Sequence, residues 1–166
     1  MPQGSIPPRE VFSNIEIQSD GTWFHSSTPI INNDILLFFK RNLHVDSKGL
    51  YIYNTISDLS EKVYIKVNGP IMSCVGFKDN MFILETGETL LEKKSNLLIY
   101  RNKMENFNEM ESLYLSVEKL NGRAKLRRQA ILDISTELNF VNGGIKWKDQ
   151  CIPEVTEIQW VINKER

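Results

Sequence analysis

Short runs of β-forming residues, separated by turn dipeptides, recur along the first half of the chain and constrain its fold more than any other feature. Ile15 and Ile17 alternate with polar neighbours, the turn dipeptide Asp20-Gly21 follows, and Thr22-Trp23-Phe24 comes next. This pattern predicts a β-hairpin. Further turns are predicted at Ser26-Ser27, Asn68-Gly69-Pro70 and Asp79-Asn80. The strands between these turns are expected to form an antiparallel meander.

Two amphipathic helices interrupt the strands. Asn33 is predicted to cap the first helix, whose apolar positions are Ile35, Phe38, Phe39 and Leu43. Asn121 is predicted to open the second helix, whose apolar positions are Leu126, Ala130, Ile131, Ile134 and Leu138. A hairpin turning at Asn142-Gly143-Gly144 follows. Antiparallel strands together with two amphipathic helices indicate an α+β protein.

Three segments are expected to be less regular. The first dozen residues contain Pro2, Pro7 and Pro8 and are not expected to form a regular element. The polar stretch from Asn102 to Glu109 is predicted to be a mobile loop between strands at Leu97–Tyr100 and Ser112–Val117. The segment Val155–Ile162 fits either a strand or a short helix.

The composition excludes several classes of protein. The 166 residues include 41% hydrophobic and 25% charged side chains, as in ordinary globular proteins, and no apolar run is long enough to span a membrane. The N-terminus has no secretory pattern, so a cytoplasmic location is expected. A net charge of −1 argues against nucleic acid polymers and anionic membranes as partners. Cys74 and Cys151 are predicted to be two buried thiols.

No motif for catalysis is present in the sequence. It contains neither a phosphate-binding glycine loop nor a dinucleotide fingerprint, and it contains neither a G-x-S-x-G elbow nor an H-E-x-x-H pair. His25 and His44 have no companion at a ligand spacing, and an exposed turn residue is the simpler interpretation of each. We therefore predict no catalytic residues, no metal site, no cofactor and no enzymatic activity.

A basic cluster marks the predicted start of the second helix. It comprises Lys119, Arg123, Lys125, Arg127 and Arg128, with no acid among them. Cations at a helix N-terminus oppose the helix dipole, so an anion is expected nearby. That anion is either a bound ligand or one of the acids Glu105, Glu109, Glu111 and Glu118.

Aromatic residues in the two predicted hairpins form a second feature. Trp23, Phe24 and Trp147 could each fill a core, which is the usual role of a hairpin aromatic. A flat ring beside a basic helix start would alternatively suit a nucleotide, since the ring stacks on the base while the cations pair with phosphate.

Several of these stretches together resemble the bacterial family known as domain of unknown function 1285. The resemblance rests first on Asp20-Gly21-Thr22-Trp23-Phe24-His25, with Pro29-Ile30 and Phe38-Phe39 after it. Weaker agreement continues in the same order at Gly49-Leu50-Tyr51, Glu61-Lys62, Gly69-Pro70, Ala124, Leu126, Arg128 and the hairpin with Trp147. It spans roughly residues 15 to 154. The chain departs from the family pattern at Asn32-Asn33 and at Asn68-Gly69-Pro70-Ile71.

The resemblance implies two small lobes, each with antiparallel sheet and one amphipathic helix, and a repeated hairpin and helix motif. We place the N-terminal lobe at 13–70, the C-terminal lobe at 71–154 and a tail at 155–166. The resemblance further implies a second lobe superficially like a pleckstrin-homology domain, a ligand site between the lobes and a role in bacterial signalling.

The leading hypothesis is a ligand-binding or regulatory protein that holds an anionic, nucleotide-like small molecule between its lobes. The expected ligand-binding residues are Trp23, His25, Arg123, Arg127, Arg128 and Trp147. A protein–protein interaction module is the alternative, and a hydrolase with a dispersed site is a third hypothesis. The oligomeric state is open.

Overall fold

The chain divides into two compact units, Met1–Gly69 and Pro70–Arg166. The computed structural model describes residues 6–92, 96–102 and 110–162, so the loop predicted from Asn102 to Glu109 lies outside the described residues except for Asn102, which belongs to a strand. The segment that the sequence analysis separated as a tail belongs to the second unit.

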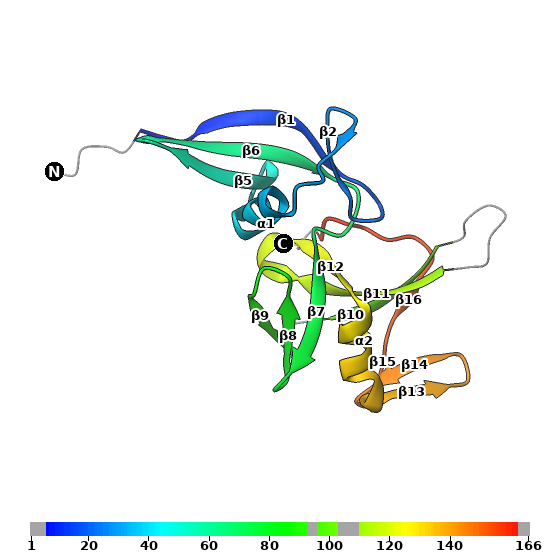
Figure 1. The fold of residues 1–166 in the computed structure, drawn as a ribbon. Coiled ribbons are helices and arrows are strands. Elements are labelled where there is room, and N and C mark those ends of the chain that lie inside the picture. The colour runs from blue at the N-terminus through cyan, green and yellow to red at the C-terminus, as the bar shows by residue number, and fades with distance from the viewer. Residues whose placement is uncertain (1–5, 93–95, 103–109, 163–166) are drawn as a thin grey trace. The chain divides into compact units, whose positions relative to one another are not determined.

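The first unit combines a six-stranded sheet with one helix. Its elements are β1 (Arg9–Ile17), β2 (Trp23–His25), β3 (Thr28–Pro29), α1 (Asn33–Arg41), β4 (Leu43–Asp46), β5 (Gly49–Ile56) and β6 (Leu59–Val67). The strand order is β3-β2-β1-β6-β5-β4. Figure 1 shows α1 on one side of this sheet.

The predicted first hairpin is confirmed. Ile17 pairs with Trp23 across it, the Asp20 carboxylate accepts the Thr22 N–H at 2.9 Å, and Gly21 takes the positive φ of 88° that the turn needs. The prediction for the N-terminus is wrong, because β1 begins at Arg9. Strand β1 pairs with β2 only at its C-terminal end, from Ile15 to Ile17. Its N-terminal residues, Arg9 to Phe12, are held in the sheet by parallel pairing with β6.

Helix α1 forms as predicted, with its cap one residue earlier. The Asn32 side chain accepts the N–H groups of Asp34 and Ile35. Phe39 stacks on Trp23 with ring centroids 6.2 Å apart, which ties the helix to the hairpin. Leu43, predicted on the helix face, is instead buried in β4. Because β-strand side chains alternate, the sheet has one apolar buried face and one face of aromatic and charged side chains.

The second unit contains two sheets. A seven-stranded sheet has the order β16-β10-β11-β12-β7-β8-β9 and a smaller one the order β13-β14-β15. The first half comprises β7 (Met72–Lys78), β8 (Met81–Leu84), β9 (Thr89–Leu91), β10 (Leu97–Asn102) and β11 (Met110–Val117). After a 3-10 turn η2 (Glu118–Leu120) come β12 (Gly122–Leu126), α2 (Arg128–Ile134), a 3-10 turn η3 (Ser135–Glu137), β13 (Leu138–Val141), β14 (Gly144–Trp147), β15 (Gln150–Cys151) and β16 (Glu154–Val155).

The predicted start of the second helix is wrong. Asn121 has a left-handed φ of 50° and ends η2, and the next five residues form the central strand β12. Gly122, Ala124 and Leu126 are buried in alternation, which is the period of a strand. A Cβ at Gly122 would lie 2.7 Å from Ile71 Cδ1, so this strand needs a small residue there. The helix begins only at Arg128.

Other predictions for the second unit are confirmed. Strands β10 and β11 occupy the predicted positions, and Val141 pairs with Gly144 across the predicted closing turn. The prediction of a strand or a short helix over Val155–Ile162 is wrong, because only Val155, at the end of β16, lies in a regular element. The Ile162 N–H bonds to the Asn121 carbonyl at 2.7 Å, so the end of the described chain is fixed beside β12.

The α+β class is therefore confirmed, but the prediction of antiparallel sheets is wrong. Each main sheet is mixed, because β1 pairs in parallel with β6 in the first unit, and β12 with β7 and β10 with β16 in the second. Within the described residues, neither helix has the length and hydropathy that crossing a membrane requires.

Candidate functional site

The predicted basic cluster does not gather at a helix start. Arg123 and Lys125 lie on β12, and only Arg127 and Arg128 lie at the beginning of α2. Lys119 bonds to Glu88, and the Arg127 Nη2 atom lies 3.4 Å from Glu85 Oε2. The prediction that five cations gather at a helix N-terminus and require an anion there is therefore wrong.

The predicted acids are not the ones seen to pair with this cluster. Glu105, Glu109 and the side chain of Glu111 lie outside the described residues. The acids that do pair come from the segment between β8 and β9, far from the cluster in sequence. Arg128 is exposed at the first residue of α2.

One residue of the cluster, Arg123, lines a cavity of about 740 Å³ that lies wholly within the second unit. We call it the Arg123 cavity. Strands β10, β11, β12, β14 and β15 contribute to its wall, as does the C-terminal segment. The lining residues are Glu92, Asn96, Leu97, Leu98, Ser116, Arg123, Trp147, Lys148, Gln150, Cys151, Ile152, Pro153 and Ile162. The structure thus brings together two of the six predicted ligand-binding residues, Arg123 and Trp147.

Arg123 carries a charge that no described acid balances. Its Nε atom donates to the Gln159 carbonyl at 2.8 Å, and neither Nη atom bonds to a described residue. Partial burial lowers the pKa of this guanidinium, yet an arginine side chain remains charged at neutral pH. Because the charge is partly removed from water, an anion in the cavity would interact with it strongly.

Trp147 presents an unused hydrogen-bond donor. The residue is buried against Phe77 and Phe82, with ring centroids 5.6 and 5.5 Å away. Its indole Nε1 atom is buried and has no hydrogen-bond partner among the described residues. Buried indole N–H groups ordinarily find an acceptor. Trp147 thus contributes its ring to the cavity wall, while its N–H is buried and without an acceptor among the described residues, as is that of Trp23.

Lys148, by contrast, is fully paired. Its Nζ atom lies 2.7 Å from Glu92 Oε2 and 3.6 Å from Glu137 Oε2. The hydrogen bond to Glu92 raises the pKa of Lys148, so the amine stays protonated. Lys148 and Asp149 both take positive φ in the tight turn between β14 and β15, which holds the amine close to the Trp147 ring.

The two cysteines differ in their surroundings. Burial raises the pKa of Cys74 to about 11. Cys151 is exposed and lies in the cavity wall, so the prediction of a buried thiol is wrong at this position. Within the part of the chain that the structure describes, no group of three or more His, Cys, Asp or Glu residues could hold a metal ion.

The two predicted site residues of the first unit, Trp23 and His25, are not among the lining residues of the Arg123 cavity. Trp23 is 1% exposed in the core of that unit, whereas His25 is exposed at the end of β2. No side-chain hydrogen bond of either residue to a described residue is present, and the buried Trp23 Nε1 lacks an acceptor there. Their contribution to a ligand site stays a prediction.

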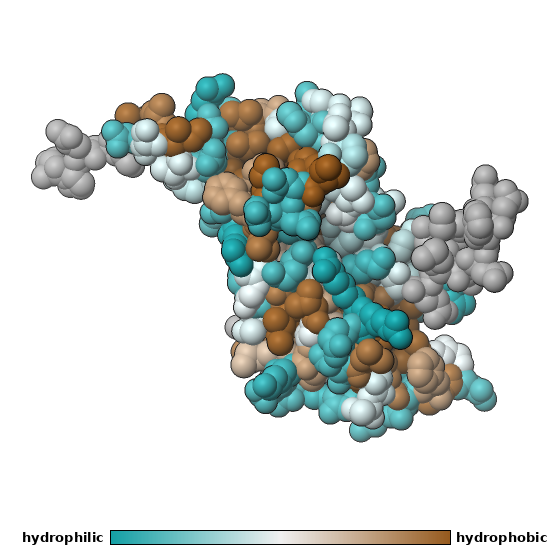
Figure 2. Space-filling model, in the orientation of Figure 1, coloured by the Kyte–Doolittle hydropathy of each residue, from teal (hydrophilic) through white to brown (hydrophobic). Residues whose placement is uncertain are grey.

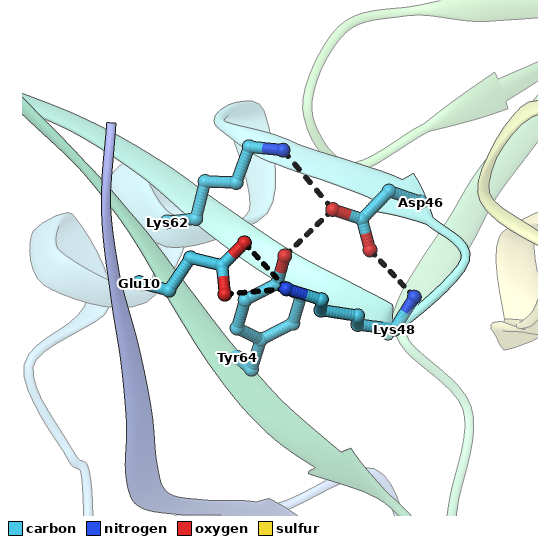
Figure 3. A network of polar contacts seen from close by, with 5 residues as sticks. All are labelled: Glu10, Asp46, Lys48, Lys62 and Tyr64. Atoms are coloured by element: carbon cyan, nitrogen blue, oxygen red, sulfur yellow. Dashed lines mark hydrogen bonds and ion pairs between the residues drawn. The ribbon is translucent and has the colours of Figure 1, made fainter. Parts of the chain in front are cut away.

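The first unit has a polar network of its own on the outer face of its sheet (Figure 3). Asp46 accepts a hydrogen bond from the Tyr64 hydroxyl at 2.6 Å and lies 3.1 Å from the Lys62 Nζ atom. The Lys48 backbone N–H also bonds to Asp46, at 2.8 Å, while the Lys48 amine pairs with Glu10 at 2.6 Å. Every charged side chain in this network therefore has a partner of opposite charge.

The same network sets the ionisation of its members. Burial raises the pKa of Asp46, but the hydrogen bonds from Tyr64, the Lys48 N–H and Lys62 outweigh it, and the net pKa is lowered. The pKa of Tyr64 is raised, mainly by burial and then by its bond to Asp46. Asp46 is thus held ionised and Tyr64 neutral, as a stable hydrogen-bonded pair requires.

Comparison with known proteins gives a match to the fold. Neither a protein-family model nor a curated protein matches this chain. A crystal structure of a DUF1285 family protein from Silicibacter pomeroyi DSS-3 matches with a TM-score of 0.54 and 19% sequence identity, covering 87% of this chain and 83% of that one. The chain has the fold of a DUF1285 family protein. The resemblance predicted from the sequence is therefore confirmed at the level of the fold.

The DUF1285 fold by itself assigns neither an activity nor a ligand, because a fold can carry many functions and this family is one of unknown function. The function must be argued from the Arg123 cavity. Sequence reasoning missed Lys148 and Cys151 as wall residues, because the cavity is assembled from strands that are distant in sequence. The alternation from Gly122 to Leu126 was the available signal that Arg123 belongs to a strand.

Proposed function

We propose that the protein is a non-enzymatic ligand-binding protein that holds an anionic small molecule in the Arg123 cavity. The observation that carries the proposal is the half-buried Arg123 guanidinium, which forms no ion pair with any described residue. A charge that is partly removed from water and left unpaired is costly, and natural proteins keep such groups mainly where a ligand uses them.

Two further observations support this proposal. The cavity, at about 740 Å³, lies in the range of ~300–1,000 Å³ that small-molecule sites occupy. Its wall combines apolar side chains, among them Leu97 and Ile152, with polar ones, among them Asn96 and Gln150. A ligand there could make apolar contacts and hydrogen bonds beside the ion pair with Arg123. The nucleotide-like character of the ligand, the signalling role, the internal repeat and the pleckstrin-homology-like second lobe stay predictions.

The proposal is tested by thermal shift with a panel of anionic metabolites and matched neutral compounds. A ligand at 100 times its Kd adds ~2.7 kcal/mol of stability, which is a shift of several degrees for a protein of this size. We expect at least one anion to raise the Tm and its neutral analogue to leave it unchanged.

Two matched variants locate the site. Arg123→Met should abolish the shift, whereas Arg128→Met removes the same charge from the exposed start of α2 and should leave it intact. A shift that survives Arg123→Met but not Arg128→Met would overturn the proposal and return the site to the helix start. No shift with any anion would also overturn it.

A protein–protein interaction module is the second candidate, supported by the surface of α1. Ile35 and Phe38 of α1 are 44% and 48% exposed, Ile31 just before the helix is 84% exposed, and no residue of α1 is buried. On the face shown in Figure 2, hydrophobic residues are interrupted by hydrophilic ones over much of the surface. Capture of a partner that is lost with Phe38→Asp but retained with Arg123→Met would favour this candidate.

A further inference from the structure

The charges in the wall of the Arg123 cavity indicate how many negative charges a ligand should carry. Three ionised side chains lie among the described lining residues: Glu92, Arg123 and Lys148. Among these three, Lys148 is matched by Glu92 at 2.7 Å, while Glu137, which also lies 3.6 Å from Lys148, is outside the lining and has a side chain 45% exposed to solvent. The single charge of Arg123 is left over, and one negative charge on the ligand would balance it.

The geometry of Arg123 indicates the kind of anion. Its Nε atom is occupied by the Gln159 carbonyl, so the N–H groups on the two Nη atoms remain as donors. Two parallel N–H groups match the two oxygens of a planar carboxylate. A doubly charged phosphate would bring a second negative charge for which the described wall offers no free cation, and burying it would cost free energy.

The rest of the wall indicates what the anionic group is attached to. Leu97 and Ile152 are buried wall residues, and Leu98, Pro153 and Ile162 add further apolar surface. This apolar part of the wall favours an apolar ligand body packed against it, because burying apolar surface is favourable.

We infer that the ligand of the Arg123 cavity is a singly charged carboxylate with an apolar body, its carboxylate bound by Arg123. This inference rests on the proposed function and narrows it to one chemical class.

The test is calorimetric titration of the full chain with phenylacetate and octanoate, beside phenylacetamide, octanol and phenyl phosphate. The two carboxylates should bind about tenfold or more tightly than the other three compounds. The neutral amide and alcohol lose the charge-assisted pair with Arg123, and the phosphate brings a second negative charge that the described wall does not balance. Arg123→Lys keeps the charge but not the fork and should weaken carboxylate binding, and Arg123→Met should remove it.

The outcomes separate this inference from the proposal beneath it. Tighter binding of phenyl phosphate than of phenylacetate would overturn the carboxylate assignment and leave an anion site in place. Equal binding of phenylacetate and phenylacetamide, or no binding of any anion, would overturn both. Lys93 and Lys94 stand beside Glu92 in the sequence but outside the described residues, so the pair of changes Lys93→Met and Lys94→Met is the control. An unchanged carboxylate preference is expected, and its loss would overturn the charge count.

Discussion

The two units differ in how a cluster of charged side chains is paired. In the first unit, Asp46, Lys62, Lys48 and Glu10 form pairs with each other, and the Tyr64 hydroxyl completes the network. In the second unit, Arg123 is half-buried in a cavity wall and no described acid is paired with it. Apart from Lys48, which lies in the turn between β4 and β5, these residues all lie on strands of a main sheet, so secondary structure does not explain the difference.

This difference separates groups that stabilise the fold from groups that are available to a ligand. A satisfied polar network gives its hydrogen-bond energy to the folded state, and removing one member leaves the others unpaired. An unpaired charge gives the folded state little and can be removed at little cost. The comparison therefore predicts opposite effects on stability for changes in the two places.

The largest effect is expected for Asp46→Ala. This change removes the acceptor of the Tyr64 hydroxyl and the counter-charge of Lys62 at once. We expect a loss of about 1–2 kcal/mol of stability in the first unit, with the low end set by solvent screening of the partly exposed pair. Hydrogen exchange measured peptide by peptide resolves the first unit from the second. An unchanged protection of β4 to β6 would mean that the network is not structural.

Tyr64→Phe should destabilise the first unit by less than Asp46→Ala does. The ring, stacked on Phe12 at 5.0 Å, is kept, and Asp46 retains its bonds from Lys62 and the Lys48 N–H. The double variant tests coupling, because the two losses should not add when both remove one hydrogen bond. Additive losses, measured by the same hydrogen exchange, would show that the Tyr64 hydroxyl acts independently of Asp46.

How well the sequence predicted each region follows from the range of the interactions involved. The Asp20-Gly21 hairpin and α1 were predictable, because a turn dipeptide and a capping Asn act over a few residues. The parallel partner of β1 was not, because β6 lies about fifty residues away and proline content near the N-terminus argued against a strand. Parallel pairing leaves no local turn signal in the sequence.

The candidate site was predictable only in part, for a related reason. Arg123 and Trp147 were chosen from the sequence as a cation and an aromatic, and the structure places both in one cavity wall. The prediction that Arg123 lies in a helix is nevertheless wrong, because Gly122, Ala124 and Leu126 are buried in alternation, as in a strand. Apolar residues recur at helical spacing from Leu126 to Ile134. This longer pattern predicts a helix more strongly than the five alternating residues of β12 predict a strand.

Arg123→Met should leave the stability of the second unit within about 1 kcal/mol of the wild type, on the more stable side, because an unpaired and partly buried charge is replaced by an apolar side chain of similar length. Hydrogen exchange of peptides from the second unit, measured over a denaturant series, resolves this unit from the first and measures the change. A loss of about 2 kcal/mol or more would show that Arg123 is a structural residue, and the contrast between the units would disappear.

The smallest effect between pH 7 and pH 5 is expected from titration of the paired carboxylates. Asp46 in the first unit and Asp133 in the second both have a lowered pKa, Asp133 through bonds from the Phe77 N–H and the Gln129 side chain. A carboxyl whose folded pKa is lowered contributes stability above its unfolded pKa of about 3.9, and this is lost as the pH falls through the folded value. Stability measured by denaturant unfolding should therefore be flat down to about pH 5 and fall below about pH 4.

Asp46→Ala should flatten the acid decline for the first unit alone, because the second unit keeps Asp133. Arg123 does not titrate in this range, so it adds nothing to either decline. If the acid decline of the first unit is the same with and without Asp46, ionisation of Asp46 does not stabilise that unit. The pairing shown in Figure 3 would then be a surface contact that contributes little to stability.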